Sequence, residues 1–213
     1  MAADPARLAQ ARLYFVTDAG TGEHLLSEAL AGGVDVLQLR EKDATDDEIL
    51  AAAATFRELC SEHGALFVLN DRPDLAIAAG ADGVHVGQED ERVAAVRERV
   101  GPDLLIGLST HSDEQLAVGL ETDADYVCVG PVYATPTKPD YPAVGLDLVR
   151  RAAGTVTRPW FAIGGIDGAS VTEVAAAGAR RVAVVRAIRD APDARAAAAG
   201  LRAAVEEAQA SVE

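Results

Sequence analysis

Short apolar runs rich in β-branched residues recur along this chain, and a turn followed by an alanine-rich helical pattern comes after nearly every one. Near-continuous apolar strands that alternate with helices are typical of a parallel sheet covered on both faces. Eight strands are predicted, at residues 13–17, 36–40, 66–70, 83–87, 104–109, 126–130, 160–165 and 182–188. The predicted helices span 23–33, 45–64, 92–101, 112–121, 145–154, 169–179 and 193–210.

A phrase also repeats along the chain. The segments AGGVDVLQL, AAGADGVHV, ETDADYVCV and AAGARRVAV each close a helical pattern and open a strand, two strand–helix units apart. A regular repeat over eight strands favours a closed (β/α)8 TIM barrel over an open doubly wound sheet. The open sheet would normally bring a G-x-G-x-x-G turn after its first strand, and TDAGTG is a poor match to that turn. We therefore expect an α/β protein with a single barrel.

Length and charge limit the domain count and the partners. With 213 residues, of which 49% are hydrophobic, the chain suits one domain over residues 1–213, with a barrel core at about 12–190 and a C-terminal helix at about 192–210. A net charge of -15 argues against a nucleic-acid partner, because phosphate backbones are bound through a surplus of Lys and Arg. No run of 18 apolar residues and no signal-peptide pattern occurs, so we expect a soluble cytoplasmic protein without membrane contact. A homo-oligomer is left open.

Polar residues at the carboxyl ends of barrel strands are the candidates for ligand binding. The second strand ends in Gln38-Leu39-Arg40-Glu41-Lys42, and strand alternation sends Gln38, Arg40 and Lys42 to one side. Two cations and an amide suit a polyanion such as diphosphate, since guanidinium binds oxygens bidentately and ammonium acts as a point charge. The alternative is a solvated strand end at which Arg40 pairs with a neighbouring acid.

Two aspartates follow adjacent strands at equivalent heights. Asn70 and Asp71 end the third strand, and Asp90 follows the end of the fourth. Two carboxylates close together repel unless a proton or a cation lies between them, and hard oxygen ligands favour Mg2+. The alternatives are a helix N-cap for Asp90, and an Asx-turn or a contact with Arg72 for Asp71.

Four further residues lie at or near the ends of the fourth and fifth strands. His85 is expected to be a packed, hydrogen-bonded histidine inside the barrel, and Ser109 a substrate contact. Ser112 is expected to cap the following helix, and His111 to be exposed.

Cys60 and Cys128 show neither metal-ligand spacing nor a disulfide framework, so both are expected to be reduced, inert thiols.

The later strand ends supply a second group of candidates. The sixth strand leads into ATPTKPD, where Thr135, Thr137 and Lys138 suit a phosphate or a developing negative charge. Lys138 and Lys42 are the only lysines of the chain. Gly165 allows close backbone approach before a helix whose N-terminal amides favour anions, and the eighth strand carries Val184, Val185 and Arg186. Two anion sites are therefore expected on one face, one near Arg40 and Lys42 and the other near Gly165 and residues 185–186.

Six motifs in this order and spacing resemble the thiamine phosphate synthase family: QLREK, LNDRPD, GVHVGQED, IGLSTHS, GPVYATPTK and AIGGI. The resemblance extends from LYFVTD to VVRAI, nearly the whole chain. It implies a transferase that joins 4-amino-5-hydroxymethyl-2-methylpyrimidine diphosphate to a thiazole phosphate, with release of diphosphate. The thiazole is carboxylated in bacterial members of the family, and the sequence does not decide between the carboxylated and the plain form.

The resemblance also implies roles for single residues. Those that bind or line the sites of the two substrates would be Gln38, Leu39, Arg40, Glu41, Lys42, Asn70, Ser109, Thr135, Pro136, Thr137, Lys138, Gly165, Val185 and Arg186. Asp71 and Asp90 would ligate Mg2+, and Lys138, Arg40 and Lys42 would be the catalytic cations. Arg186 departs from the family pattern, which often has serine there, so its geometry in the phosphate pocket is open.

The expected chemistry needs no nucleophile or general base. Neutralising the leaving diphosphate lets a benzylic-type carbon ionise, and a positioned thiazole nitrogen then attacks it.

Two alternative functions are compatible with a barrel of this kind. A thiazole tautomerase-like barrel would need no diphosphate or metal set, and a non-catalytic phosphate-binding barrel would bind ligand without forming product.

Overall fold

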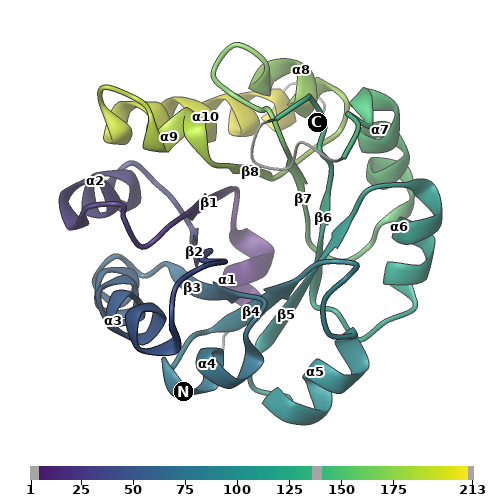
Figure 1. The fold of residues 1–213 in the computed structure, drawn as a ribbon. Coiled ribbons are helices and arrows are strands. Elements are labelled where there is room, and N and C mark those ends of the chain that lie inside the picture. Colours follow the sequence, from purple (N-terminus) through teal and green to yellow (C-terminus); the bar gives the residue numbers. More distant parts are fainter. Residues whose placement is uncertain (1–4, 136–140, 211–213) are drawn as a thin grey trace.

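The structure, a computed structural model that describes residues 5–135 and 141–210, confirms the predicted barrel (Figure 1). Eight parallel strands are hydrogen-bonded in chain order, and the last pairs with the first to close the ring. The strands are β1 (Leu13–Thr17), β2 (Val36–Leu39), β3 (Leu66–Asn70), β4 (Gly83–Val86), β5 (Leu105–Thr110), β6 (Tyr126–Val129), β7 (Trp160–Ile163) and β8 (Val182–Val184).

Helices surround the barrel in the described residues (Figure 1). The outer ring consists of α2 (Glu23–Ala31), α3 (Asp46–His63), α4 (Pro73–Ala78), α5 (Val93–Val100), α6 (Asp113–Leu120), α7 (Gly145–Thr155), α8 (Val171–Ala176), α9 (Arg186–Arg189) and α10 (Ala194–Ala210). A further helix, α1 (Pro5–Gln10), lies across the barrel instead, and its Leu8 packs with the inward-facing Tyr14 and Tyr126. Among the described helices, none is both long and apolar enough to cross a bilayer.

Two predicted strands were wrong at their carboxyl ends. The eighth strand was expected over residues 182–188, but β8 ends at Val184, and α9 begins at Arg186. The apolar run continues because Ile188 is fully buried from the helical turn, and a short apolar run does not distinguish a strand from a buried helix. The seventh strand also ends early, at Ile163, because Gly164 and Gly165 adopt φ values of 99° and 68°, outside the extended region.

Each copy of the repeated phrase builds the same piece of barrel wall. One position of the phrase packs outward against the helices, as Leu37, Val84, Val127 and Val182. The next position faces the barrel interior and lines its cavity, as Gln38, His85, Cys128 and Ala183. The repeat therefore fixes which side chain of each even-numbered strand reaches the ligand face.

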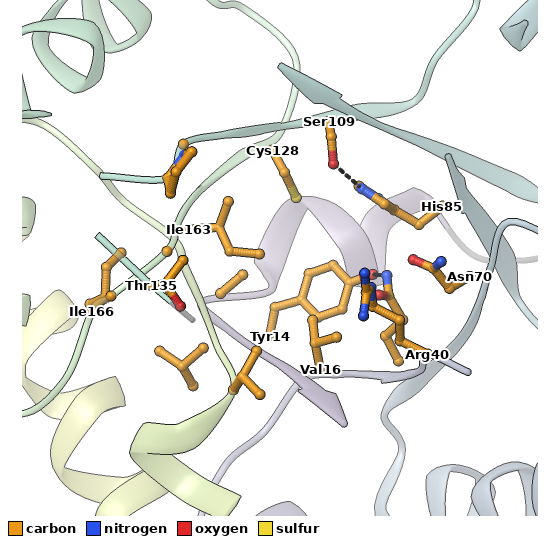
Figure 2. Close-up of a pocket in the computed structure, with 18 of the residues that line it drawn as sticks. Tyr14, Val16, Arg40, Asn70, His85, Ser109, Cys128, Thr135, Ile163 and Ile166 are labelled. Carbon is orange, nitrogen blue, oxygen red and sulfur yellow. Dashed lines mark hydrogen bonds between the residues drawn. The ribbon is translucent and has the colours of Figure 1, made fainter. Parts of the chain in front are cut away.

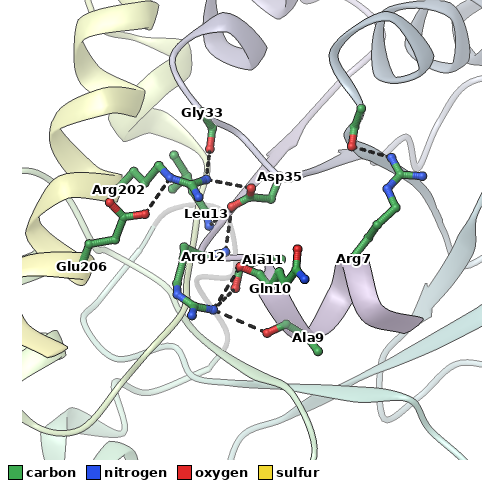
Figure 3. A network of polar contacts seen from close by, with 11 residues as sticks. Arg7, Ala9, Gln10, Ala11, Arg12, Leu13, Gly33, Asp35, Arg202 and Glu206 are labelled. Atoms are coloured by element: carbon green, nitrogen blue, oxygen red, sulfur yellow. Dashed lines mark hydrogen bonds and ion pairs between the residues drawn. The ribbon is translucent and has the colours of Figure 1, made fainter. Parts of the chain in front are cut away.

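In each of the first three copies, an aspartate joins a strand to a helix at the N-terminal end of the barrel, opposite the ligand face. We call each of these places a corner. Each aspartate accepts the backbone N–H of the facing residue on the preceding strand and pairs with an arginine of a covering helix. The three sets are Asp35 with Leu13 N at 3.0 Å and Arg202 at 2.7 Å, Asp82 with Phe67 N at 2.8 Å and Arg57 at 2.9 Å, and Asp125 with Ile106 N at 2.7 Å and Arg97 at 2.6 Å. Figure 3 shows the first of these corners, where Asp35 lies between Arg202 and the backbone of Arg12 and Leu13.

We predict that Asp82→Ala destabilises the protein by about 2–3 kcal/mol, because it removes a charged acceptor from the buried Phe67 N–H and leaves Arg57 without its partner. For a protein of this size, the loss corresponds to a fall of roughly 5–10 °C in Tm, measured by thermal denaturation. The control is Asp147→Ala, which breaks an exposed Asp147–Arg150 pair and should cost under about 0.5 kcal/mol. Equal effects of the two substitutions would contradict the role of the corner.

Candidate active site

A cavity of about 370 Å3 opens at the carboxyl ends of the strands, where the barrel fold predicts the ligand face. All eight strands contribute to its lining, through Tyr14, Gln38, Asn70, His85, Ser109, Cys128, Ile163 and Ala183. Figure 2 shows Arg40 and Asn70 on one side of this cavity and Thr135 and Ile166 on the other, with Tyr14 and Cys128 between them.

The cationic side of the cavity has the predicted strand alternation. Gln38, Arg40 and Lys42 line the cavity, whereas Leu39 is fully buried among the residues that pack against the helices. The Glu41 carboxylate turns away and accepts the Ala19 N–H at 2.6 Å. Among the described residues, the side chains of Arg40 and Lys42 make no hydrogen bond or ion pair, so the expected alternative of a paired Arg40 is not observed. Two cations without an ion-pair partner among the described residues make this side of the cavity attractive to a polyanion.

The two predicted aspartates meet beside these cations. Asp71 is half-buried, and its burial, together with the hydrogen-bonded and negatively charged Asp90, raises the pKa of Asp71 to about 6, against the smaller opposing effects of Lys42 and Arg40. Asp90 also accepts the Gly87 N–H at 2.7 Å. Asp71 is the one described non-glycine residue with positive φ, at 61°, a conformation that aspartate tolerates better than most residues.

Neither an arginine contact nor a helix cap accounts for these two aspartates. Arg72 pairs with Asp46 at 2.7 Å and with Asp74 at 3.2 Å rather than with Asp71. Helix α5 begins at Val93 with Arg92 at its N-cap, so Asp90 does not cap it. No group of three or more His, Cys, Asp or Glu side chains suited to a metal occurs in the described part of the chain. A two-carboxylate site remains compatible with Mg2+, which usually keeps several water or phosphate ligands.

A chain of hydrogen bonds crosses the floor of the cavity. Gln38 Nε2 donates to the Tyr14 hydroxyl at 2.6 Å, and the hydroxyls of Tyr14 and Tyr126 are 2.9 Å apart. Tyr126 reaches His85 Nδ1 at 3.2 Å, and His85 Nε2 reaches Ser109 Oγ at 2.9 Å. All five side chains are buried, and burial raises the pKa of both tyrosines well above the ordinary value, so both keep their protons. The expectation that His85 is a packed, hydrogen-bonded histidine is confirmed.

One consistent proton arrangement starts from the first bond of this chain. Because Gln38 donates to the Tyr14 oxygen, the Tyr14 proton is available to Tyr126, which can donate in turn to His85 Nδ1. His85 then carries its proton on Nε2 and donates to Ser109. In this arrangement, the two ends of the chain offer a ligand an amide oxygen acceptor from Gln38 and a hydroxyl donor from Ser109.

The residues predicted to form a second anion site line the same cavity. Thr135, Gly165, Val185 and Arg186 all line it, and a Cβ at Gly165 would lie 2.7 Å from Tyr133 Cβ, so only glycine fits there. Val185 is the N-cap residue of α9, and Arg186 is its first residue. Pro136, Thr137 and Lys138 lie outside the described residues. The structure thus brings together every predicted site residue that it describes except the side chains of Leu39 and Glu41.

Several lining residues were missed by the sequence interpretation. His111 was expected to be exposed, but it is partly buried and lines the cavity. Its ring lies against that of Tyr141, with centroids 4.1 Å apart and planes tilted by 41°. Cys128 is a buried thiol outside any disulfide, as expected, yet it faces the cavity rather than only the core. The repeated phrase held the signal, since it aligns Cys128 with Gln38 and His85. Ser112 caps α6 as expected, by accepting the Gln115 N–H at 3.2 Å.

Cations without ion-pair partners, adjoining carboxylates and a hydrogen-bonded polar floor at the catalytic end of a (β/α)8 barrel are typical of an enzyme active site. The family model for thiamine monophosphate synthase (TMP-TENI) matches residues 13–188. The chain belongs to this family.

Curated and solved relatives agree with that assignment. A thiamine-phosphate synthase of Acidothermus cellulolyticus is 53% identical over 194 residues, covering 88% of this chain and 92% of the relative. One from Thermobifida fusca is 52% identical over 202 residues and covers 92% and 93%. The solved thiamine phosphate pyrophosphorylase of Pyrococcus furiosus superposes with a TM-score of 0.87 at 36% identity, over 96% of this chain and 98% of that one.

We predict that Asp71→Asn stabilises the protein at pH 7.5 in buffer without divalent ions. The pKa of Asp71 is raised from 3.8 to about 6, so the folded state binds more protons than the unfolded state between about pH 4 and 6. Stability therefore falls as pH rises through that window, and the full cost is present above it. The shift corresponds to about 3 kcal/mol, which partial solvent exposure reduces to about 1 kcal/mol.

Asparagine keeps the shape of the side chain and tolerates the positive φ, so the substitution isolates the charge. We expect a Tm gain of roughly 2–4 °C at pH 7.5 that largely vanishes at pH 4. The control, Asp103→Asn, removes one negative charge from an exposed turn and should change Tm little at either pH. A Tm gain for Asp71→Asn that is the same at both pH values would show that the pair is not the cause.

Proposed function

We propose that this enzyme condenses 4-amino-5-hydroxymethyl-2-methylpyrimidine diphosphate with a thiazole phosphate to form thiamine phosphate and release diphosphate. The observation that carries the proposal is the unpaired Arg40 and Lys42 beside the Asp71–Asp90 pair, in one cavity with a polar floor. A tautomerase or a simple phosphate-binding barrel has no use for this charge arrangement.

The cavity suggests how the two substrates lie. The diphosphate would meet Arg40, Lys42 and Asn70, with Lys138 as a further cation, and the aminopyrimidine would lie over the floor. Its exocyclic amine donates and its ring nitrogen accepts, which complements the Gln38 acceptor and the Ser109 donor. The thiazole phosphate would be held by Thr135, Thr137, Gly165 and the backbone near residues 185 and 186.

Asp71 and Asp90 fit Mg2+ through the chemistry of their side chains. They are hard oxygen ligands. Burial and the neighbouring Asp90 raise the pKa of Asp71 to about 6, and a divalent cation would relieve the repulsion between the two carboxylates. When bound, Mg2+ would neutralise charge on the diphosphate oxygens. The residues of this chain that surround it need only hold the ion and orient the leaving group.

The reaction then follows from stabilising the leaving group and positioning the thiazole. Arg40, Lys42 and Lys138 neutralise charge as the carbon–oxygen bond to diphosphate breaks. The electron pair leaves with diphosphate, and the electron-rich aminopyrimidine stabilises the resulting cation. The thiazole nitrogen, held by its phosphate, attacks that carbon, which makes the step effectively unimolecular. With a carboxylated thiazole, loss of CO2 completes the reaction.

The decisive experiment incubates the purified protein with the pyrimidine diphosphate and either the plain or the carboxylated thiazole phosphate, with and without Mg2+. We expect Mg2+-dependent thiamine phosphate together with one equivalent of diphosphate. Binding without product would indicate a non-catalytic barrel, and isomerised thiazole without diphosphate would indicate a tautomerase. Either result would refute the proposal.

Within that assay, Lys42→Ala and Lys138→Ala should each lower turnover by about 100-fold, or about 2.7 kcal/mol in the barrier, because each removes charge from the departing diphosphate. Far-UV circular dichroism should show an intact fold. Arg195→Gln, which breaks an exposed pair with Glu28, is the control and should turn over normally. Near-normal turnover in a lysine variant would remove that lysine from the catalytic group.

The directed hydrogen-bond chain yields a separate prediction. Tyr126→Phe touches no cavity atom but interrupts the chain between Tyr14 and His85, so the chain no longer links the Gln38 acceptor to the Ser109 donor. Discrimination between the 4-amino pyrimidine diphosphate and its 4-oxo analogue, measured as a ratio of kcat/KM values, should fall about fivefold, the value of one neutral hydrogen bond. Tyr133→Phe removes a hydroxyl outside the chain and should leave the ratio unchanged.

A further inference from the structure

The fourth copy of the repeated phrase departs from the other three at the N-terminal end of the barrel. Where the first three copies carry Asp35, Asp82 and Asp125, AAGARRVAV carries Arg180. The strand register supports this alignment. Tyr14 faces Val36, so Leu13 lies opposite Asp35, and Ala162 faces Val182, so Trp160 lies opposite Arg180.

The substitution reverses the chemistry of this corner. In the other corners, an aspartate accepts the facing backbone N–H and pairs with an arginine. Arginine has five donors and no acceptor, so Arg180 cannot take that part. Within the described ranges, no side chain accepts the Trp160 N–H. The fourth corner therefore contains an arginine but no carboxylate from the described residues.

A second cavity, of about 390 Å3, lies at this corner, at the end of the barrel opposite the active site. Four arginines line it together with Trp160, namely Arg12, Arg158, Arg180 and Arg181, and none of its lining residues is acidic. The chain carries 34 acidic and only 19 basic residues, so a local group of four cations runs against its composition. Such a group concentrates positive potential in a small concave space.

The hydrogen bonds of these arginines leave their charge uncompensated. Arg12 donates to backbone carbonyls such as that of Gln10 at 3.0 Å, and Arg158 donates to that of Leu120 at 2.7 Å. Arg181 donates from Nη2 to the Ala9 carbonyl at 2.6 Å, and Arg180 makes no side-chain hydrogen bond to any described residue. None of the four pairs with a carboxylate among residues 5–135 and 141–210.

Arg181 has a buried polar group that lacks a partner. Its Nε is buried and has no hydrogen-bond partner, the only such side-chain atom in the described part of the chain. Burial, followed by repulsion from Arg12 and Arg180, lowers the pKa of the Arg181 guanidinium. A buried donor without a partner costs about 1–3 kcal/mol in stability. An anionic acceptor bound among these arginines would remove that cost.

We propose that this corner is a second anion site that binds a small multivalent oxyanion of the phosphate type. Its oxygens would take the place that an aspartate carboxylate holds in the other three corners. Guanidinium groups suit such a ligand because their planar forks bind phosphate oxygens bidentately. The site is independent of the proposed reaction, since it lies at the other end of the barrel and shares no lining residue with the active-site cavity.

Trp160 is the single tryptophan of the chain and lines this cavity, so its fluorescence reports on the site directly. The full-length protein is titrated with sodium phosphate and with sodium diphosphate, against sodium chloride at matched ionic strength. We expect a saturable change with the two oxyanions and none with chloride. An equal response to chloride would reduce the effect to charge screening and overturn the proposal.

Variants separate this site from the active site. Arg180→Gln should weaken the oxyanion response at least tenfold, whereas Arg99→Gln, an exposed arginine of α5, should leave it unchanged. Lys42→Ala removes a cation of the active-site cavity and should also leave the Trp160 response unchanged. If Lys42→Ala abolished the response, or Arg180→Gln bound as tightly as the wild type, the site would not be at this corner.

A restoring substitution completes the test. Arg180→Asp recreates the aspartate of the other corners, so it should raise Tm in phosphate-free buffer and remove the stabilisation that phosphate gives the wild type. Turnover should remain normal, because Arg180 lies outside the active-site cavity. A lower Tm than the wild type in phosphate-free buffer, or undiminished stabilisation by phosphate, would contradict the proposal.

Discussion

The closure of eight parallel strands in chain order is the constraint on which the rest of the structure depends. Because every strand runs in the same direction, all eight carboxyl ends meet on one rim, and alternation sends every second side chain inward. Residues as distant in sequence as Gln38 and Ala183 therefore line one cavity. The loops after the strands can then vary without disturbing the hydrogen-bonded wall that positions them.

The two ends of this barrel treat charge differently. At three N-terminal corners, each aspartate is paired with an arginine and with a backbone donor, an arrangement that holds adjacent strands together. At the active-site rim, Arg40 and Lys42 lack such partners among the described residues, and Asp71 lies against Asp90. Charged groups without ion-pair partners in the free protein remain available to a ligand, at a cost in stability.

The sequence predicted the barrel and most of the site because both depend on periodicity and on residue type at strand ends. Gln38, Arg40 and Lys42 face the cavity as alternation requires, and Asp71 and Asp90 meet because adjacent strands end at the same height. The end of β8 was missed because an apolar run such as 182–188 fits a strand and a buried helix equally well. The chain of hydrogen bonds through Tyr14 and Tyr126 was out of reach, because it joins strands that are far apart in sequence.

Positions at which the four copies of the repeated phrase differ indicate where the barrel binds ligands, whereas the shared positions indicate packing. In the inward-facing position, Gln38, His85 and Cys128 are followed in the fourth copy by Ala183, the smallest of the four, which lines the cavity together with residues 185 and 186. At the aspartate position of the phrase, Asp35, Asp82 and Asp125 are followed by Arg180, and the cavity there is lined by cations instead of an ion pair. A fold built from copies of one unit needs the same packing in each copy. A side chain that departs from the repeat is therefore a candidate for ligand binding, because it does not serve the packing that the copies share.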